Sequence, residues 1–189
     1  MATFGKTSIG GTTDQWTSAD WAVACKFTLN ENGSVESMTV YMYSYGGNIR
    51  LGIYDHDAVN NRPNNLKGQT DSRYIQSTGY TWETFTFSTP INLDAGTYWL
   101  AVITDADFYS AYDAGTTNQS GGHTDAYADG FLESWGSAIS YTSREWSLYA
   151  TYTATGALGQ PYISRVQQIS GMQTFNPIHL LKVKPRKLI

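Results

Sequence analysis

The chain has 189 residues, of which 41% are hydrophobic and 15% are charged, and its formal net charge is −4. A chain of this length can bury a sizeable core within one domain, and its five prolines are too few for a collagen-like or proline-rich disordered protein. No apolar run reaches the roughly 20 residues that span a bilayer, and abundant Thr, Ser, Tyr and Gly beside scarce Glu and Lys favour β-strands.

Segments in which apolar and polar residues alternate recur along the chain and predict strands. Met38, Val40 and Met42 share one face of such a segment, whereas residues 96–104 are apolar on both faces, as in a strand that is covered on both sides. Turn sequences separate the segments, and no long amphipathic helix is evident. The predicted fold class is therefore all-β, an antiparallel β-sandwich. The predicted strands cover residues 3–9, 22–29, 34–43, 49–54, 84–87, 96–104 and 146–153.

Two connections, residues 57–68 and 111–130, are longer than the turns between the other strands. Loops of this length in a compact β domain are often functional. A change in composition after the last predicted strand divides the chain into a β-sandwich domain, residues 1–156, and a C-terminal arm, residues 157–189. Residues 1–160 hold all sixteen acidic residues but only seven of the twelve basic ones, so the body is acidic and the arm is basic.

The segment INLDAGTYWLAV, residues 91–102, resembles a stretch that recurs in jelly-roll-like β-sandwich domains of prokaryotic surface and phage structural proteins. The opening FGKTSIGG, the hairpin KFTLNENGSVESMTVYM and the strand NIRLGIYDHD are similar to the same group, so the resemblance covers about residues 3–154. It implies a jelly-roll-like sandwich with a carbohydrate-binding-like, structural or adhesive role, and rarely an enzymatic one. Residues 161–189 fall outside the resemblance.

Residue types that serve catalysis or metal binding do not form a known motif in this sequence. Cys25 lies in mid-strand, where a small buried hydrophobe is expected rather than a nucleophile. We therefore expect a protein that is not an enzyme and has no catalytic residue. Asp55 and Asp57 are oxygen ligands of the kind that Ca²⁺ prefers, but Asp at a strand end more often bonds its own backbone in a turn. We expect no cofactor, with Ca²⁺ at these two residues as the alternative.

Aromatic and amide residues are dense between residues 107 and 146, the combination with which proteins bind sugar rings or protein surfaces. Trp135 lies between Ser134 and Gly136, and we expect this loop setting to present its ring to a ligand. The alternative is that the rings pack around the rim of the sandwich with their polar tips in water. The candidate residues for binding a carbohydrate or a partner are Tyr109, Tyr112, Trp135 and Tyr141.

The arm combines an apolar segment, IHLLKV at residues 178–183, with basic residues around Pro185. Two prolines oppose the amphipathic helix that membrane binding needs, and an acidic body repels nucleic acid, so we expect neither partner. We expect the arm to add a strand to a sheet edge of a neighbouring subunit, while its bases contact an acidic surface such as the body of another copy. A solvated, disordered terminus is the alternative. The residues expected to dock are Arg165, Ile178, Leu180, Lys182, Lys184, Arg186 and Lys187.

Three functions fit this sequence, and we favour the first, a non-enzymatic structural or adhesive module. It is a phage virion decoration or another structural protein that docks on an assembly through its arm, with copies of itself among its partners. Residues 1–20 show no secretory signal and Cys25 is the single cysteine, as expected of a protein that assembles inside a reducing cell and is released on lysis to a virion or extracellular surface. The alternatives are a carbohydrate-binding module, with a glycan as its partner, and a prokaryotic surface-filament subunit joined by strand addition.

Overall fold

The structure, a computed structural model, describes residues 1–136 and 139–156. The chain divides into two units after Leu158, and the described residues all belong to the first unit, Met1–Leu158. The arm expected at residues 157–189, with all its docking residues, therefore lies outside the described residues.

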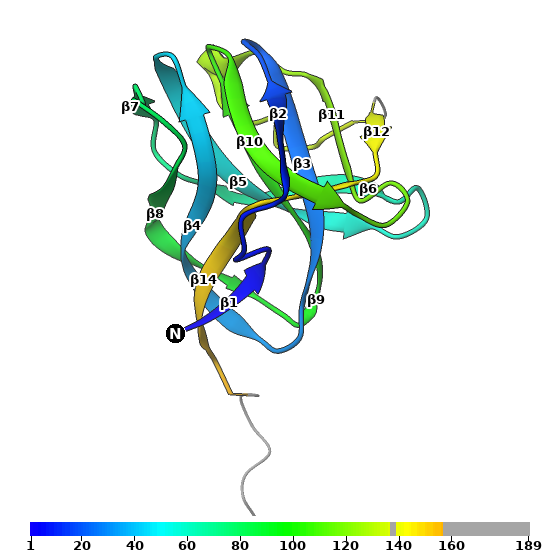
Figure 1. Cartoon of the computed structure of the whole chain (residues 1–189). Coiled ribbons are helices and arrows are strands. Elements are labelled where there is room, and N and C mark those ends of the chain that lie inside the picture. Colours follow the sequence, from blue (N-terminus) through cyan, green and yellow to red (C-terminus); the bar gives the residue numbers. More distant parts are fainter. Residues whose placement is uncertain (137–138, 157–189) are drawn as a thin grey trace, which may run out of the picture. The chain divides into compact units, whose positions relative to one another are not determined.

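Two antiparallel sheets of seven strands each pack face to face (Figure 1). In sheet A the order is β1-β14-β4-β10-β13, with β2 paired to β10 and β8 paired to β4. In sheet B the order is β12-β11-β3-β9-β5-β6, with β7 paired to β5. Strands make up 66% of the structure and helix is almost absent, so the predicted all-β antiparallel sandwich is confirmed.

The strands of each sheet come from distant parts of the chain. Sheet A is built from β1 (Ala2–Gly5), β2 (Thr12–Thr17), β4 (Gly33–Ser44), β8 (Thr81–Leu93), β10 (Phe108–Ala114), β13 (Arg144–Trp146) and β14 (Leu148–Ala154). Sheet B is built from β3 (Trp21–Leu29), β5 (Gly47–Asp57), β6 (Arg62–Gln69), β7 (Arg73–Ile75), β9 (Gly96–Thr104), β11 (Ser120–Thr124) and β12 (Ser140–Thr142). One short 3-10 helix, η1 (Tyr127–Asp129), follows β11, and in the described part of the chain no helix has the length and apolar character of a membrane span.

The main core lies between the two sheets and follows from the alternation in the sequence. Met38, Val40 and Met42 of β4 are fully buried in it, as the pattern predicts. The intervening positions of the same strand, Tyr41 and Tyr43, lie on the outer face of sheet A and are half-buried. The buried face of each strand therefore fixes which side chains the other face presents to solvent.

A second apolar cluster lies on the outer face of sheet B. Trp99 and Ala101 of β9 belong to it, whereas Leu100 and Val102 belong to the main core. The prediction that residues 96–104 are covered on both sides is therefore confirmed. The cover is provided by the segment 125–136, whose buried apolar side chains are Tyr127, Phe131 and Trp135.

Both connections that were expected to be long loops contain strands. Residues 57–68 include most of β6, and residues 111–130 include β11 and the end of β10. β6 is polar and contains Pro63 because it is the edge strand of sheet B, where a proline removes no bond from the interior of the sheet. The expected first strand is also shorter than predicted: it ends at Gly5, which has a φ of 117°, and β2 follows it.

Candidate functional site

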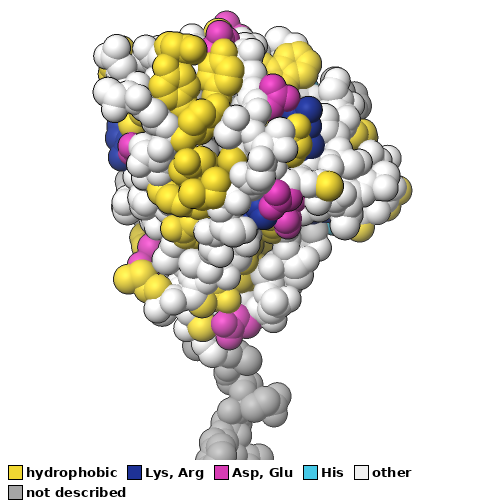
Figure 2. Space-filling view, in the orientation of Figure 1, with side chains coloured by type: hydrophobic (Ala, Val, Ile, Leu, Met, Phe, Trp, Pro, Cys, Tyr) yellow, Lys and Arg dark blue, Asp and Glu magenta, His cyan; other side chains and the backbone are white. Residues whose placement is uncertain are grey.

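Seven aromatic side chains form a continuous strip on the outer face of sheet A. They are carried by β4, β8, β10 and β14 and by the turns that adjoin β4 and β8. Figure 2, in the orientation of Figure 1, shows hydrophobic side chains gathered in a band over this sheet. This aromatic strip consists of Tyr41, Tyr43, Tyr45, Tyr80, Trp82, Tyr109 and Tyr149.

Strand register brings these rings together. Tyr41 and Tyr43 point outward from β4 because side chains two residues apart share a face. Tyr41 is paired with Trp82 of β8, and Tyr43 is paired with Tyr109 of β10. Tyr149 of β14 completes this side, with its ring centroid 5.5 Å from that of Trp82. Four strands that are far apart in the sequence thus contribute to one surface.

Neighbouring rings of the strip pack on one another at varied angles. The centroid of Tyr43 lies 4.8 Å from that of Tyr45 and 6.1 Å from that of Tyr109. Tyr41 and Tyr80 are stacked, with 20° between their planes, whereas Tyr45 stands edge-on to Tyr109 at 85°. The strip therefore presents a mixture of ring faces, ring edges and hydroxyl groups.

The strip faces solvent, with five of its rings half-buried and two exposed. Tyr45 is 68% exposed and Tyr80 is 37% exposed. Partial burial raises the pKa of Tyr43, and partial burial together with the Asp107 carboxylate raises the pKa of Tyr109. These two phenols therefore keep their protons at neutral pH and can donate as well as accept hydrogen bonds. Contiguous exposed apolar patches of this kind mark interaction sites on soluble proteins.

Of the four aromatic candidates from the sequence, Tyr109 alone belongs to the aromatic strip. Tyr112 packs against the main core. Tyr141 is half-buried, and its hydroxyl donates to the carbonyl oxygens of Asn60 and Asn61, both at 3.1 Å. The structure therefore separates these three tyrosines and gives Tyr141 the role of fixing the loop between β5 and β6.

Trp135 is the fourth candidate, and the structure places it in the interior. Its side chain is 1% exposed, and its ring centroid lies 5.0 Å from that of Tyr54 and 4.4 Å from that of His123. The expectation that its loop presents the ring to a ligand is wrong. The segment 125–136 folds back on sheet B because burying its aromatic side chains removes a large apolar area from water.

Asp55 and Asp57 form hydrogen bonds within their own loop. Asp57 accepts from the side chain and the backbone N–H of Asn60, which hold the pKa of its carboxyl below the ordinary range, and it pairs with Arg62 at 3.3 Å. Asp55 accepts from the backbone N–H of Asn65 at 2.7 Å. Among residues 1–136 and 139–156, no three His, Cys, Asp or Glu side chains group as a metal site. The bonds of Asp57 are turn interactions of the kind weighed against calcium in the sequence, whereas the bond of Asp55 joins β5 to β6.

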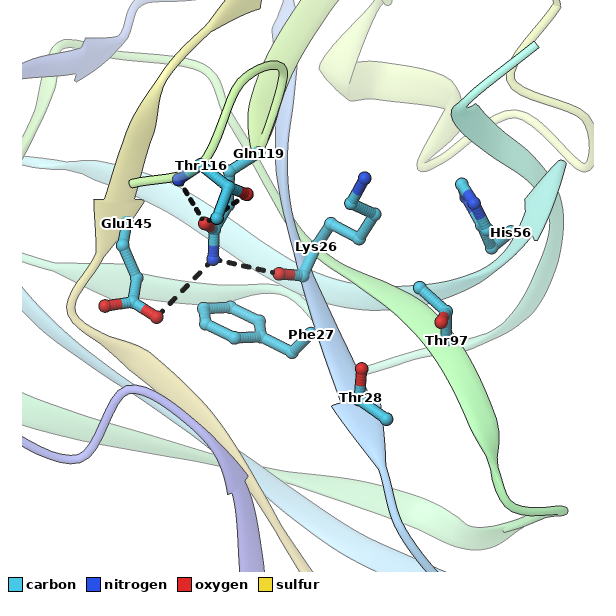
Figure 3. A pocket seen from close by; sticks show the side chains of 8 residues that line it. All are labelled: Lys26, Phe27, Thr28, His56, Thr97, Thr116, Gln119 and Glu145. Carbon is cyan, nitrogen blue, oxygen red and sulfur yellow. Dashed lines mark hydrogen bonds between the residues drawn. The ribbon is translucent and has the colours of Figure 1, made fainter. Parts of the chain in front are cut away.

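A polar pocket of about 410 Å³ opens where β11 stops pairing with β3 (Figure 3). The Gln119 amide donates to the Lys26 carbonyl oxygen at 3.3 Å and to the Glu145 carboxylate at 3.4 Å. The Trp99 indole N–H donates to Nδ1 of His56 at 3.0 Å. Figure 3 shows Glu145 and His56 on opposite sides of β3, so these two groups do not converge on one point. The hydrogen bonds of the pocket link strands to one another.

Cys25 is fully buried in β3, as its place in mid-strand predicts. Burial raises the pKa of its thiol to about 12. The thiolate form that would act as a nucleophile is therefore scarce at neutral pH.

Alternation places Tyr41 and Tyr43 on the outward face of their strand, but these two residues are not among the binding residues expected from the sequence. The signal in the sequence that points to them is three tyrosines at alternate positions, 41, 43 and 45. Their neighbours in the strip come from segments whose register with β4 cannot be read from the sequence.

Comparison with known proteins adds no family to this description. No protein-family model matches the chain, and no curated protein matches it. The surface geometry of the sandwich is therefore the basis for inferring a function.

Proposed function

We propose that this protein is a non-enzymatic structural and adhesive module of a larger assembly, a phage virion decoration or a structural protein of the same kind. In this proposal the aromatic strip binds a protein surface, including the surface of another copy of the chain. The exposed strip is the observation that carries the proposal, because tyrosine and tryptophan dominate the binding energy of protein interfaces.

The arrangement of the rings favours a protein partner over a polysaccharide. A sugar chain stacks on ring faces that are open to solvent. Tyr43 and Tyr45 instead pack edge to face at 78°, and Tyr45 and Tyr109 do so at 85°. In each edge-to-face pair one ring covers a face of the other, so fewer flat faces are open to a sugar. The remaining mixture of ring faces, edges and hydroxyls resembles the apolar and hydrogen-bonding groups found at protein interfaces.

Neutral polar side chains border the strip on the same face of sheet A. Thr84 and Thr151 each lie two residues along a strand from a member of the strip. Thr39 is buried beside them, with its Oγ1 2.9 Å from Oγ1 of Thr84. An apolar, aromatic centre with a polar rim is the usual anatomy of a protein interface. The surroundings of the strip therefore suit the same kind of partner as the strip itself.

In this proposal the arm, residues 157–189, attaches the module to its assembly. Its five basic residues contrast with a body that holds all sixteen acidic residues of the chain. Opposite charges favour contact between the arm of one copy and the body of another. A virion or an extracellular surface is the location that goes with this role.

Sedimentation velocity of the full chain tests the proposal. We expect self-association that weakens at least about tenfold in the double variant Tyr45→Ser/Tyr80→Ser, because truncating central aromatic residues of an interface costs this much or more. Val59→Ser is the matched control: Val59 is 92% exposed, in the loop between β5 and β6, and we expect no change.

A charge-reversal variant tests the arm within the full chain. Replacing Lys182, Lys184, Arg186 and Lys187 by Glu is expected to weaken association, and the difference should shrink as salt is added because screening removes long-range attraction. A chain that stays monomeric up to about 100 μM, or an association that Tyr45→Ser/Tyr80→Ser leaves intact, contradicts the proposal.

A further inference from the structure

β8 is a long edge strand of sheet A. Among the strands that the structure describes it pairs with β4 alone, and Figure 1 shows it beside β4 at the margin of the sheet. Its second half is not free, because the pairing with β4 is interrupted at residues 87–90 and β6 packs closely there: a Cβ at Gly68 would lie 2.5 Å from Cδ1 of Ile91. The free edge of β8 is therefore its first half, residues 81–86.

The direction of the main-chain groups along this free edge follows from the bonds of β4. The Tyr41 N–H donates to the Ser147 carbonyl oxygen at 2.9 Å, on the side of β4 away from β8. Tyr41 is paired with Trp82, so this pair exchanges no main-chain hydrogen bonds. Such pairs alternate with bonded pairs in an antiparallel ladder, so the N–H and C=O groups of Trp82, Thr84 and Thr86 point away from the sheet.

A hydrogen bond from sheet B confirms this direction. Nη1 of Arg73 donates to the Thr84 carbonyl oxygen at 3.0 Å, and within residues 1–136 and 139–156 no other hydrogen bond reaches these outward groups. Thr84 and Thr86 are exposed, and the Arg73 side chain is 42% exposed. A strand that pairs with the free edge therefore displaces one exposed hydrogen bond and gains a row of main-chain partners.

The other sheet edges in the described part of the chain are short or occupied. β6 is covered by the segment 125–136, with the Leu66 N–H donating to the Glu133 carbonyl oxygen at 2.9 Å. On β2 the Asp14 carboxylate accepts from the Gln15 N–H at 2.8 Å, which removes a main-chain donor from that edge. β1, β7, β12 and β13 each have three or four residues. The free edge of β8 is the place on this sandwich that best suits an added strand.

We infer that the free edge of β8 pairs with residues 178–183 from the arm of another copy of the chain. This segment, IHLLKV, is the apolar part of the arm, and it has the same length as the free edge, six residues. Residues 157–177 precede it, and about 20 extended residues span about 70 Å. That exceeds the roughly 40 Å width of a domain of this size, so the segment can reach a neighbouring molecule.

The side chains of the segment suit both faces of the free edge. Alternation in a strand places Ile178 and Leu180 on one face and Leu181 and Val183 on the other. One face of the edge carries Trp82 of the aromatic strip, and the other carries Phe85 of the main core. Main-chain bonds supply affinity in strand addition, and alternate side chains supply specificity. The inference rests on the role in assembly proposed for the arm and names the place where the arm docks.

Disulfide trapping in the full chain locates the contact. The native Cys25 is fully buried, so introduced cysteines react without interference. The variant Thr84→Cys, at the centre of the free edge, is mixed with Leu180→Cys and separately with Leu181→Cys; these neighbours point to opposite faces, so one of them shares the face of position 84. We expect a mixed disulfide dimer in at least one mixture, identified by mass spectrometry. Thr3→Cys, exposed on β1 at the opposite edge of sheet A, is the matched control and is expected to form none.

A proline variant tests the main-chain bonds. Thr84→Pro removes an outward N–H and keeps the bonds of β8 to β4, because an edge strand tolerates proline where its N–H faces solvent. Self-association in sedimentation velocity is expected to weaken at least about tenfold, with an unchanged circular dichroism spectrum. Thr3→Pro is the matched control: the Lys6 N–H donates to the Leu148 carbonyl oxygen at 2.8 Å, so alternation points the Thr3 N–H away from β14, and we expect no change.

The outcomes separate this inference from the proposed function. The inference is overturned if neither arm cysteine is trapped by Thr84→Cys, if Thr84→Cys forms a disulfide only with itself, which would show β8 paired with β8, or if Thr84→Pro leaves association intact. If Thr84→Pro has no effect while Tyr45→Ser/Tyr80→Ser and the charge reversal of the arm both weaken association, the proposed function stands and β8 is rejected as the docking edge. A chain that stays monomeric rejects both.

Discussion

The six tryptophans of this chain occupy three environments that their neighbours in the sequence do not distinguish. Trp135 follows a serine and precedes a glycine, yet it is buried; Trp82 follows a threonine and precedes a glutamate, and it lies on the outer face of sheet A. The local sequence of each suits a loop or a strand surface equally well. The environments are the second cluster for Trp99 and Trp135, the aromatic strip for Trp82, and the main core for Trp16, Trp21 and Trp146.

Replacing Trp135 is expected to destabilise the fold strongly. Trp135→Ala leaves a cavity beneath the segment 125–136, and we expect the free energy of unfolding to fall by about 3–5 kcal/mol, as for other large core truncations. Trp82→Ala, at a half-buried surface position, is expected to cost less than about 1 kcal/mol. Urea unfolding followed by circular dichroism measures both, and equal costs would contradict the burial of Trp135.

His123 is expected to make stability depend on pH. Burial lowers the pKa of His123 in the folded state, whereas in the unfolded chain it keeps its ordinary value of about 6.5. Above that value both states are neutral. As the pH falls below it, the unfolded state binds a proton that the folded state does not, so stability falls until the pH passes through the lowered folded pKa. The midpoint of urea unfolding should therefore drop between about pH 7.5 and about pH 5.5.

The variant His123→Phe identifies the source of this pH dependence. It removes the titrating group and fills the space beside Trp135, so the drop in the midpoint should become smaller. His56 contributes in the same direction, because burial and the nearby Lys26 lower its pKa, and His56→Gln serves as the matched variant. If neither variant reduces the drop in the unfolding midpoint, groups other than these two histidines cause the pH dependence.

At the scale of elements, the segment 125–136 behaves as a cover for sheet B that a few hydrogen bonds hold in place. The Tyr54 hydroxyl of β5 donates to the Leu132 carbonyl oxygen at 2.6 Å. The Asp125 carboxylate accepts from the Leu132 backbone N–H at 3.3 Å, and burial raises its pKa. The backbone N–H and carbonyl oxygen of Leu132 are thus both hydrogen-bonded, which helps to hold a segment with a single turn of helix on the sheet.

The variant Tyr54→Phe is expected to loosen this cover. It removes the donor to a carbonyl group and should cost about 1–2 kcal/mol, while the ring stays buried. In this variant, hydrogen exchange of the amides of residues 130–135 should speed up by more than exchange of the β9 amides does. The matched control is Tyr141→Phe, which frees the loop between β5 and β6 instead; the prediction is wrong if both variants speed exchange in the same segment.

At the scale of the whole molecule, residues 1–156 are expected to fold without the arm. Among the described residues, the side chains that close the main core come from the strands of both sheets. A chain that ends at residue 156 should therefore melt within about 3 °C of the full chain, by calorimetry. A much larger loss would show that the arm belongs to the core of its own protomer, and the role proposed for it in assembly would fail with it.

Much of the fold could be predicted from the sequence, and little of the candidate site. The alternation in residues 34–43 gave the buried face of β4, and the apolar run at residues 96–104 gave a strand that is covered on both sides. β6 and β11 were not predicted, because an edge strand rich in Asn and a strand of Ser-Gly-Gly-His-Thr carry turn-like sequences that only pairing with neighbours overrides. Trp135 was assigned to the surface because nothing in its neighbours indicates that its segment folds back on the sheet.

The sequence by itself determined the class of the fold. Apolar and polar side chains alternate every two residues within each strand, and this local pattern is what builds a two-layer sandwich. Only the tertiary structure decided which rings meet. Tyr41, Trp82 and Tyr149 become neighbours through the register of three strands, and Trp16 meets Trp146 across almost the whole length of the described chain. Register and sheet packing depend on contacts between distant residues, and no local pattern encodes them.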